Sequence, residues 1–431
     1  MNRRNFIKKV ASAAAATIVL PYILPTGRLF AATGTRIANH VVVCMLAGGI
    51  RSLESIHKAD GNLMPNLLVG SEPISSDIAG AMDALPPSPL AAPLQTQASF
   101  YKNFRYNSPI AGHFQGHAVL ATGAYVNEFV NFSDYSPKPT IFEYYRKHNS
   151  PAQTALNAWW VSLYTGENEF LSHSTHPDYG VNYGANFLVP NAFLPYNYES
   201  IDLCRTFSPA QKTSVADMQQ FLNQNFKQPL PTSNAVNTPA ERLRLEQFYT
   251  NTINAVKSGA LSNPWGAGNA MNGDMLNVMF AERIIKEFKP ELLMVNMTNV
   301  DVAHDRFTAS CNNLRKADFA TAHLWNTIQN TPGMQNDTIM IVVPEHGRDQ
   351  RENTITDQYG RHGTDHGGDA MSSEIFCMVA GPANKVYQNN VINAVQGESI
   401  DIVPTVAHIL GFHNDIPAGL LQGTPLFTSF K

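Results

Sequence analysis

The chain has 431 residues, of which 44% are hydrophobic and only 15% charged, and its formal net charge of −4 leaves 14 histidines uncounted. This composition is typical of a globular protein with core material for one large domain or two modest ones. No excess of basic residues is present, which argues against a nucleic-acid partner.

The first residues, MNRRNFIKKV followed by ASAAAATIVLPYIL, have the pattern of an export signal. Arg3 and Arg4 precede an alanine-rich apolar run that is too short, and too interrupted by proline, for a spanning helix. We interpret residues 1–32 as a twin-arginine-type signal peptide. This predicts a periplasmic or extracellular protein whose mature chain, 33–431, has no transmembrane segment. The alternative is a basic amphipathic N-terminus that lies on a membrane surface.

Four short apolar runs predict buried strands, at 39–49, 291–300, 338–345 and 374–382. Each run is nearly continuous, as expected of parallel strands that are covered on both faces.

Apolar residues recur with a helical period in three segments between these runs, at 238–256, 274–288 and 312–330. Strands that alternate with helices predict a doubly wound α/β fold, with a mainly parallel sheet and helices on both faces. The segment 126–235 is rich in Asn, Tyr, Phe and Pro and has weak periodicity. We interpret it as a loop-rich insertion within a single domain, 33–431.

Potential metal ligands follow the predicted strands. The run 291–300 leads into Asp301 and His304, and the run 338–345 ends in Glu345 before His346. In an open α/β sheet, functional groups collect at the carboxyl ends of the strands.

The loop after the third strand adds His362, Asp365 and His366. Two interpretations compete, a polar surface loop that is rich in histidine and the rim of a metal site. The clustering of imidazoles and carboxylates after strand ends favours a divalent metal, because zinc binds such nitrogen and oxygen ligands. We expect His362 to lie on the surface or behind the ligands.

The segment SIDIVPTVAHILGF, 399–412, resembles the closing helix of the alkaline phosphatase superfamily, which includes sulfatases and phosphodiesterases. The residues before this segment also follow the superfamily's order, in which an acid–histidine pair at a strand end precedes a later histidine. The resemblance implies an alkaline-phosphatase-like fold. It also implies that one or two metal ions are held by residues at five matching positions: Asp301, His304, Glu345, His346 and His366.

A closer resemblance is to the DUF1501 family, a sulfatase-like branch of that superfamily. LAGGIRSLES (46–55) resembles its Gly-Gly turn, PEHGRDQREN (344–353) its Glu-Phe-Gly-Arg motif, and Asp365 with His366 its later Asp-His. GHFQGHAVLATG (112–123) resembles its N-terminal histidine motif and contributes His113 and His117.

The first strand departs from the superfamily pattern, because it ends in Ala47, Gly48 and Gly49 where relatives have a metal-binding Asp. We expect zinc, with calcium or magnesium as alternatives, as one or two ions. His113, His117 and Arg348 would supply proton transfer or anion binding.

Three functions remain open. The first is an exported metal-dependent hydrolase that acts on small anionic phosphate or sulfate esters, or on sulfated or phosphorylated glycans. The second is a catalytically degenerate relative that binds an anion or a glycan at the same rim. The third is a structural module of the cell envelope.

Overall fold

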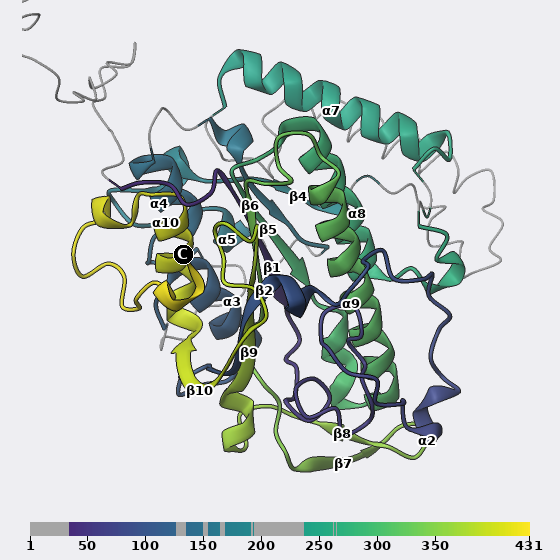
Figure 1. Ribbon diagram of the computed structural model, residues 1–431. Coiled ribbons are helices and arrows are strands. Elements are labelled where there is room, and N and C mark those ends of the chain that lie inside the picture. Colours follow the sequence, from purple (N-terminus) through teal and green to yellow (C-terminus); the bar gives the residue numbers. More distant parts are fainter. Residues whose placement is uncertain are drawn as a thin grey trace, which may run out of the picture.

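The computed structural model describes residues 34–125, 135–149, 154–163, 169–190, 193, 237–261, 263 and 265–431. An eight-stranded sheet crosses the molecule in the order β10-β2-β9-β6-β1-β5-β3-β4 (Figure 1). Its strands are β1 (His40–Leu46), β2 (Ala98–Arg105), β3 (Ala158–Val161), β4 (Asn186–Leu188), β5 (Leu292–Met297), β6 (Thr338–Pro344), β9 (Glu374–Ala380) and β10 (Asn390–Glu398).

The centre of the sheet is parallel. Strand β1 pairs in parallel with both β5 and β6, and β5 pairs in parallel with β3. Successive residues of β1 enter two separate cores, because side chains alternate between the faces of a strand. Val42 and Cys44 lie in one core, whereas Val41 and Val43 lie in the other, and all four are fully buried.

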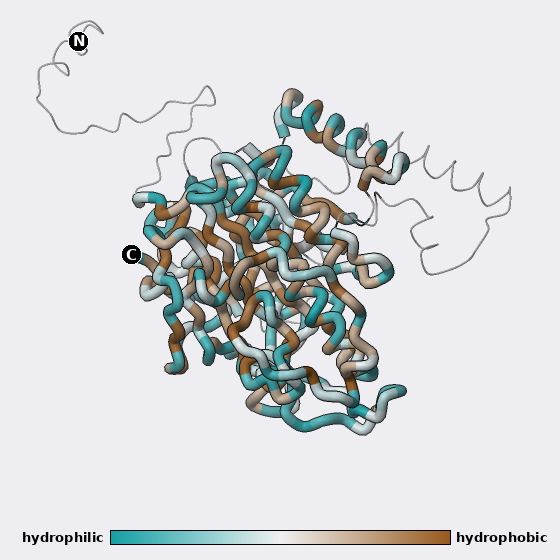
Figure 2. Tube along the Cα trace, turned by 45° about the vertical axis from the view of Figure 1, so that its right-hand side comes forward, coloured by the Kyte–Doolittle hydropathy of each residue, from teal (hydrophilic) through white to brown (hydrophobic). Residues whose placement is uncertain are grey.

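Helices cover both faces of this sheet (Figure 1). One face packs against α8 (Gly273–Phe288) and α9 (Phe307–Gln329), with α7 (Pro239–Lys257) beyond them. The other face packs against α3 (His113–Thr122), α4 (Ile141–His148) and α10 (Ile402–Ile409). Two shorter helices are α2 (Ser76–Ala79) and α5 (Glu169–Ser172). In Figure 2 the apolar residues gather in the interior between these layers. The predicted α/β class, with a mainly parallel sheet covered on both faces, is confirmed.

The predicted helices are present, and their ends follow local chemistry. Helix α7 begins after Thr238, whose hydroxyl accepts from the backbone N–H of Glu241 while the Glu241 carboxylate accepts from the Thr238 N–H. This capping box satisfies two N–H groups that the first turn of a helix leaves without partners. Helix α10 lies within the predicted segment 399–412, and the left-handed Gly411 (φ 79°) follows its end.

The expectation that 374–382 forms a parallel strand is wrong. Strand β9 runs antiparallel to both of its neighbours, β2 and β6. Between β6 and β9 the chain forms only the two-stranded hairpin β7 (Glu352–Thr356) and β8 (His362–Thr364) and a short 3₁₀ turn. A parallel return normally needs a crossover that contains a helix, and no α-helix lies between Pro344 and Glu374.

The described parts of 126–235 supply helix α4 and the parallel strands β3 and β4 as well as loops. Residues 194–236 and the N-terminal segment with Arg3 and Arg4 lie outside the described residues. Within the described part of the chain, no helix is long and apolar enough to span a membrane.

Candidate metal centre

Two strand ends deliver the first side chains of the site. Strand β5 leads into a 3₁₀ turn (Asn299–His304) that carries Asp301 and His304, and β6 leads directly into Glu345 and His346. Because β1 pairs in parallel with both strands, all three carboxyl ends lie at one edge of the sheet.

The end of β1 fits between these groups only because it is glycine. Gly48 and Gly49 adopt φ values of 95° and 74°, in the left-handed region that favours glycine. A Cβ on Gly48 would lie 2.9 Å from the Asp301 Cβ, and one on Gly49 would lie 2.6 Å from the His346 ring. Because Gly48 has no side chain, its backbone nitrogen can lie 2.6 Å from Glu345 Oε1, to which the N–H donates.

Helix α3 contributes two histidines from the other side of the site. His113 and His117 are four residues apart, so they occupy the same face of the helix. Gly116 lets the helix approach β6 closely, since a Cβ there would lie 3.0 Å from the Glu345 Cβ. His113 Nδ1 is 2.6 Å from Glu345 Oε1, and His117 Nδ1 is 2.6 Å from Glu345 Oε2.

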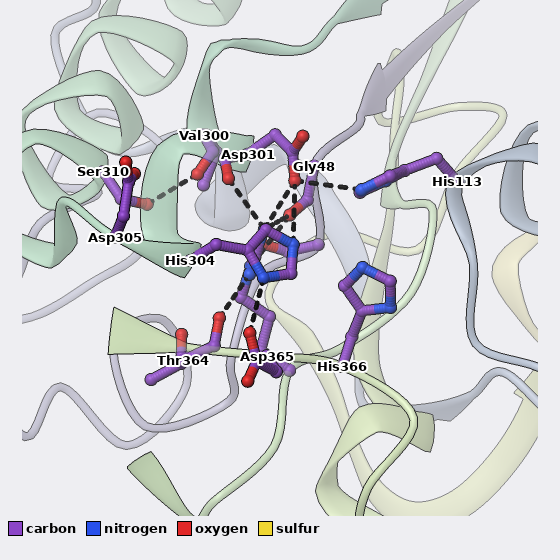
Figure 3. A network of polar contacts seen from close by, with 12 residues as sticks. Gly48, His113, Val300, Asp301, His304, Asp305, Ser310, Thr364, Asp365 and His366 are labelled. Atoms are coloured by element: carbon purple, nitrogen blue, oxygen red, sulfur yellow. Dashed lines mark hydrogen bonds and ion pairs between the residues drawn. The ribbon is translucent and has the colours of Figure 1, made fainter. Parts of the chain in front are cut away.

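The β7–β8 hairpin leads the chain back to the site with Asp365 and His366. Asp365 accepts a hydrogen bond from His304 Nδ1 at 2.6 Å. Asn353 on β7 donates to the His304 carbonyl at 2.9 Å and to Asp365 at 3.2 Å. The hairpin thereby fixes the outer side of the site, where Figure 3 shows His304, Asp365 and His366 facing one another.

Four histidines converge, although they come from segments far apart in the sequence. The ring centroids of His346 and His366 are 4.5 Å apart, those of His113 and His366 4.8 Å, and those of His304 and His366 5.0 Å. Two groups could each hold an ion, with ligand atoms within 4.8 Å of one another. These groups are His113 with His346 and His366, and His113 with Asp301 and His304.

The hydrogen bonds of three of these rings fix their tautomers. Nδ1 of His346 lies 2.7 Å from the Gly347 carbonyl, and Nδ1 of His366 lies 2.6 Å from the Ala111 carbonyl. A carbonyl only accepts, so each Nδ1 donates, as does His304 Nδ1 to the Asp365 carboxylate. In the neutral ring Nε2 then keeps its lone pair. This is the arrangement of metal-bound histidines, whose other nitrogen donates to a carbonyl or carboxylate.

The charges of the site are strongly coupled. Burial alone would lower the pKa of His113, but the carboxylates of Glu345 and Asp301 raise it to about 10. Burial would raise the pKa of Glu345, but His117, His113 and His346 hold it well below its usual range. Burial, followed by the charges of His346 and His113, lowers the pKa of His366 to about 4. At neutral pH His366 is therefore in the neutral form that binds metals.

Arg348 lies beneath the site and is only 2% exposed. Its Nε donates to the carbonyls of Gly48 and Gly49 at 2.8 and 3.1 Å, and its Nη1 donates to the Thr364 carbonyl at 2.6 Å. Its Nη2 donates to Asp301 Oδ1 at 2.8 Å and also to the Gly48 carbonyl. The sequence predicts that Arg348 helps in proton transfer or anion binding; in the structure its guanidinium joins β1, the Asp301 turn and β8.

His362 and the hydroxyl of Thr122 lie outside this group. His362 is exposed on β8, with Nδ1 3.2 Å from Thr356 Oγ1. Thr122 is buried within α3, where its hydroxyl donates to the Ala118 carbonyl at 2.7 Å. The contacts described for the histidines and carboxylates of the site involve no Ser, Thr or Cys side chain.

The residues present fit a divalent cation. Glu345 Oε2 is buried, and its near neighbour is a ring nitrogen, His117 Nδ1, at 2.6 Å. The nearby His117 Nδ1 is also 2.6 Å from the backbone carbonyl of His113. Imidazole nitrogens and carboxylate oxygens, already oriented by partners behind them, are the donor set that zinc prefers. The set consists of His113, Asp301, His304, Glu345, His346 and His366.

No protein-family model matches this chain, and no curated protein matches its sequence. Solved structures with a similar course of the chain include the alkaline phosphatase PafA, which is 11% identical with a TM-score of 0.46 and coverage of 91% of this chain and 99% of that one. The lipoteichoic acid synthase LtaP from Listeria monocytogenes is 12% identical, with a TM-score of 0.45 and coverage of 95% and 79%.

A third solved structure holds D-glucosamine-2-N,6-O-disulfate as its substrate. It is 11% identical to this chain, with a TM-score of 0.39 and coverage of 91% of this chain and 79% of that one. The fold and the site together define this protein as an α/β protein with a histidine and carboxylate cluster at the carboxyl ends of its central strands. Its function is inferred from its own side chains.

Proposed function

We propose that this protein is a metal-dependent hydrolase of phosphate or sulfate esters. The observation that carries the proposal is the orientation of His304, His346 and His366. Each donates Nδ1–H to an oxygen behind it and keeps Nε2 for a cation. The carboxylates of Asp301 and Glu345 lie beside these rings, each 3.0 Å or less from His113.

A divalent ion in such a site polarises an ester oxygen and lowers the pKa of a bound water. Residues of this chain fix the two carboxylates before any ion binds. The Gly48 N–H fixes Glu345, and Arg348 fixes Asp301. A site that is ordered before the reaction needs little reorganisation during it.

Water is the nucleophile that the side chains favour. No Ser, Thr or Cys side chain appears among the described contacts of the cluster, so no covalent intermediate on such a residue is proposed. His113 lies at the centre of the group and would hold the cation as a ligand in both candidate sets, so the proton that it shares with Asp301 and Glu345 would leave when the ion binds.

A second candidate is a protein that binds an anionic ester or glycan at this site without turnover. The absence of a Ser, Thr or Cys side chain from the described contacts, and the Gly48–Gly49 end of β1, which offers no carboxylate, favour this alternative. The two candidates share the metal site and differ in turnover only.

We further propose export through the twin-arginine pathway, on the basis of Arg3, Arg4 and the alanine-rich run that follows. Replacing both arginines with lysine should leave the precursor in the cytoplasm, as measured by fractionation and immunoblotting. Normal export of that variant would exclude this pathway.

The test of the hydrolase is turnover of p-nitrophenyl phosphate, bis(p-nitrophenyl) phosphate and p-nitrophenyl sulfate by the zinc-loaded protein. We expect hydrolysis of at least one ester, loss of activity on chelation, and recovery when zinc returns. His346→Ala should abolish the activity, and His362→Ala, on the exposed hairpin, serves as the matched control. Tight metal binding without turnover of any ester would favour the second candidate.

A further inference from the structure

The charge balance of the site limits which ester it can accept. Three carboxylates, those of Asp301, Glu345 and Asp365, oppose the single guanidinium of Arg348. With the ligating histidines neutral, these four groups sum to a formal −2. One divalent ion brings the sum to zero, and a proton on His117 would raise it only to +1.

Among the described residues, Arg348 is the one cationic side chain of the Lys and Arg type that is ion-paired with a member of this cluster. Its donors are directed to the Gly48, Gly49 and Thr364 carbonyls and to Asp301, and it is buried. Arg306 is 64% exposed and lies 3.4 Å from Asp305, which points away from the histidines in Figure 3.

The position of Arg348 also disfavours a second metal ion. The guanidinium is 2.8 Å from Asp301 Oδ1 and lies on the side of Asp301 that faces Gly48. An ion bound there would meet a fixed positive charge at short range, and the end of β1 provides no carboxylate to offset it. The permanent charge of Arg348 therefore disfavours a second cation bound to Asp301 beside it.

The carboxylates at the rim face any ligand that enters. The Asp301 and Asp365 side chains are 43% and 51% exposed, whereas Glu345 is fully buried. A ligand with two negative charges would meet these carboxylates with no described Lys or Arg side chain beyond the buried Arg348 to offset them. A ligand with one negative charge meets half of that repulsion.

From this balance we infer that the ester taken by this site carries a single negative charge, as a sulfate monoester or a phosphodiester does, and is not the dianion of a phosphate monoester. The inference rests on the proposed function and narrows its substrate class.

Binding of two non-hydrolysable probes tests the inference. Benzenesulfonate carries one negative charge, and phenylphosphonate carries two at about pH 8.5. Titration calorimetry on the zinc-loaded protein should show benzenesulfonate bound at least about tenfold more tightly. Equal affinity, or tighter binding of phenylphosphonate, would overturn the inference.

A charge variant makes the test specific to the site. Asp365→Asn keeps an oxygen that accepts from His304 but removes one negative charge from the rim. At equal zinc content, it should shift the preference toward phenylphosphonate by roughly fivefold to tenfold. The control, Glu246→Gln, removes one charge from the exposed face of α7 and should leave the preference unchanged. An identical preference in both variants would contradict the charge argument.

Kinetics separate this inference from the proposed function and distinguish the two monoanionic ester classes. Turnover of p-nitrophenyl sulfate or bis(p-nitrophenyl) phosphate that exceeds turnover of p-nitrophenyl phosphate would support the inference and the proposed hydrolase together. Preferred turnover of p-nitrophenyl phosphate would overturn the inference but leave the hydrolase in place. If neither probe binds and no ester is turned over, both the inference and the proposed hydrolase function are wrong.

Discussion

Arg348→Gln is predicted to weaken the fold and the metal site together. The guanidinium joins three segments, through the Gly48 and Thr364 carbonyls and the Asp301 carboxylate. Glutamine reaches fewer of these acceptors and carries no charge.

The magnitude follows from what the variant leaves without a partner. Removing one member of a buried ion pair costs about 3–5 kcal/mol. The Asp301 side chain is 43% exposed, so water screens part of that loss. The buried carbonyls add about 1–3 kcal/mol for each acceptor left without a donor. We therefore expect a loss of about 3 kcal/mol in the free energy of unfolding of the metal-free protein.

Urea unfolding followed by circular dichroism measures this loss, with zinc affinity measured in parallel. Arg351→Gln is the matched control, because Arg351 lies three residues further along the same loop and is exposed. Arg348→Lys keeps the charge but not the planar fork, and it should recover only part of the stability. A loss for Arg348→Gln no larger than that for Arg351→Gln would refute the role assigned to Arg348.

Three further predictions concern pH and the glycine turn. Because the pKa of His113 is raised to about 10, a metal ion that binds below that pH must displace its proton. Zinc affinity should then rise about tenfold per pH unit between about pH 7 and 9, and calorimetry in two buffers that shows no proton release would contradict this. Gly49→Ala places a Cβ 2.6 Å from the His346 ring at a φ of 74°, so this variant should reduce zinc affinity at least about tenfold. The control is Gly360→Ala, in an open turn, which should leave zinc affinity unchanged. Burial raises the pKa of Asp274 to about 7. Its folded carboxyl therefore binds a proton more tightly than the unfolded one, and its contribution to stability, at most about 4 kcal/mol, is lost as the pH rises from about 4 through about 7. In Asp274→Asn that decline should disappear from the urea midpoints measured across this range, and an unchanged pH profile would argue against a protonated Asp274.

The sequence predicts four of the longer strands from their continuous apolar runs, but it misses the short buried strands β3 and β4 as well as β2 and β10. The continuous apolar runs of β1, β5 and β6 are visible because both faces of these strands are covered. Strand β10 lies at the edge of the sheet with exposed Val391 and Val395, so its apolar residues do not form a continuous run. The direction of β9 is set by the connection that precedes it, and a strand pattern alone does not reveal that connection.

The site is predictable to a similar extent. Asp301, His304, Glu345, His346 and His366 are found in the sequence because they follow strand ends, and the structure brings them together. His113 was expected to transfer protons, but the structure also makes it a candidate ligand in both groups. The spacing of His113 and His117, one helical turn apart, is the signal that points to a shared face.

The partners that orient the ligands could not be assigned in this way. Asp365 and Asn353 hold His304 from a hairpin about 50 to 60 residues away, a contact that no local pattern encodes. The position of Arg348 under the Gly48 carbonyl likewise depends on strand register.

The measurement that tests the metal centre most directly is a zinc titration of the purified, metal-free protein, compared with His366→Ala and His362→Ala. The two variants remove the same side chain from the two ends of one short segment, inside and outside the cluster. We predict one tightly bound ion in the unmodified protein and in His362→Ala, and affinity reduced about 100-fold in His366→Ala. Equal affinity in all three proteins, or no binding in the unmodified one, would contradict the metal centre and the hydrolase proposed from it.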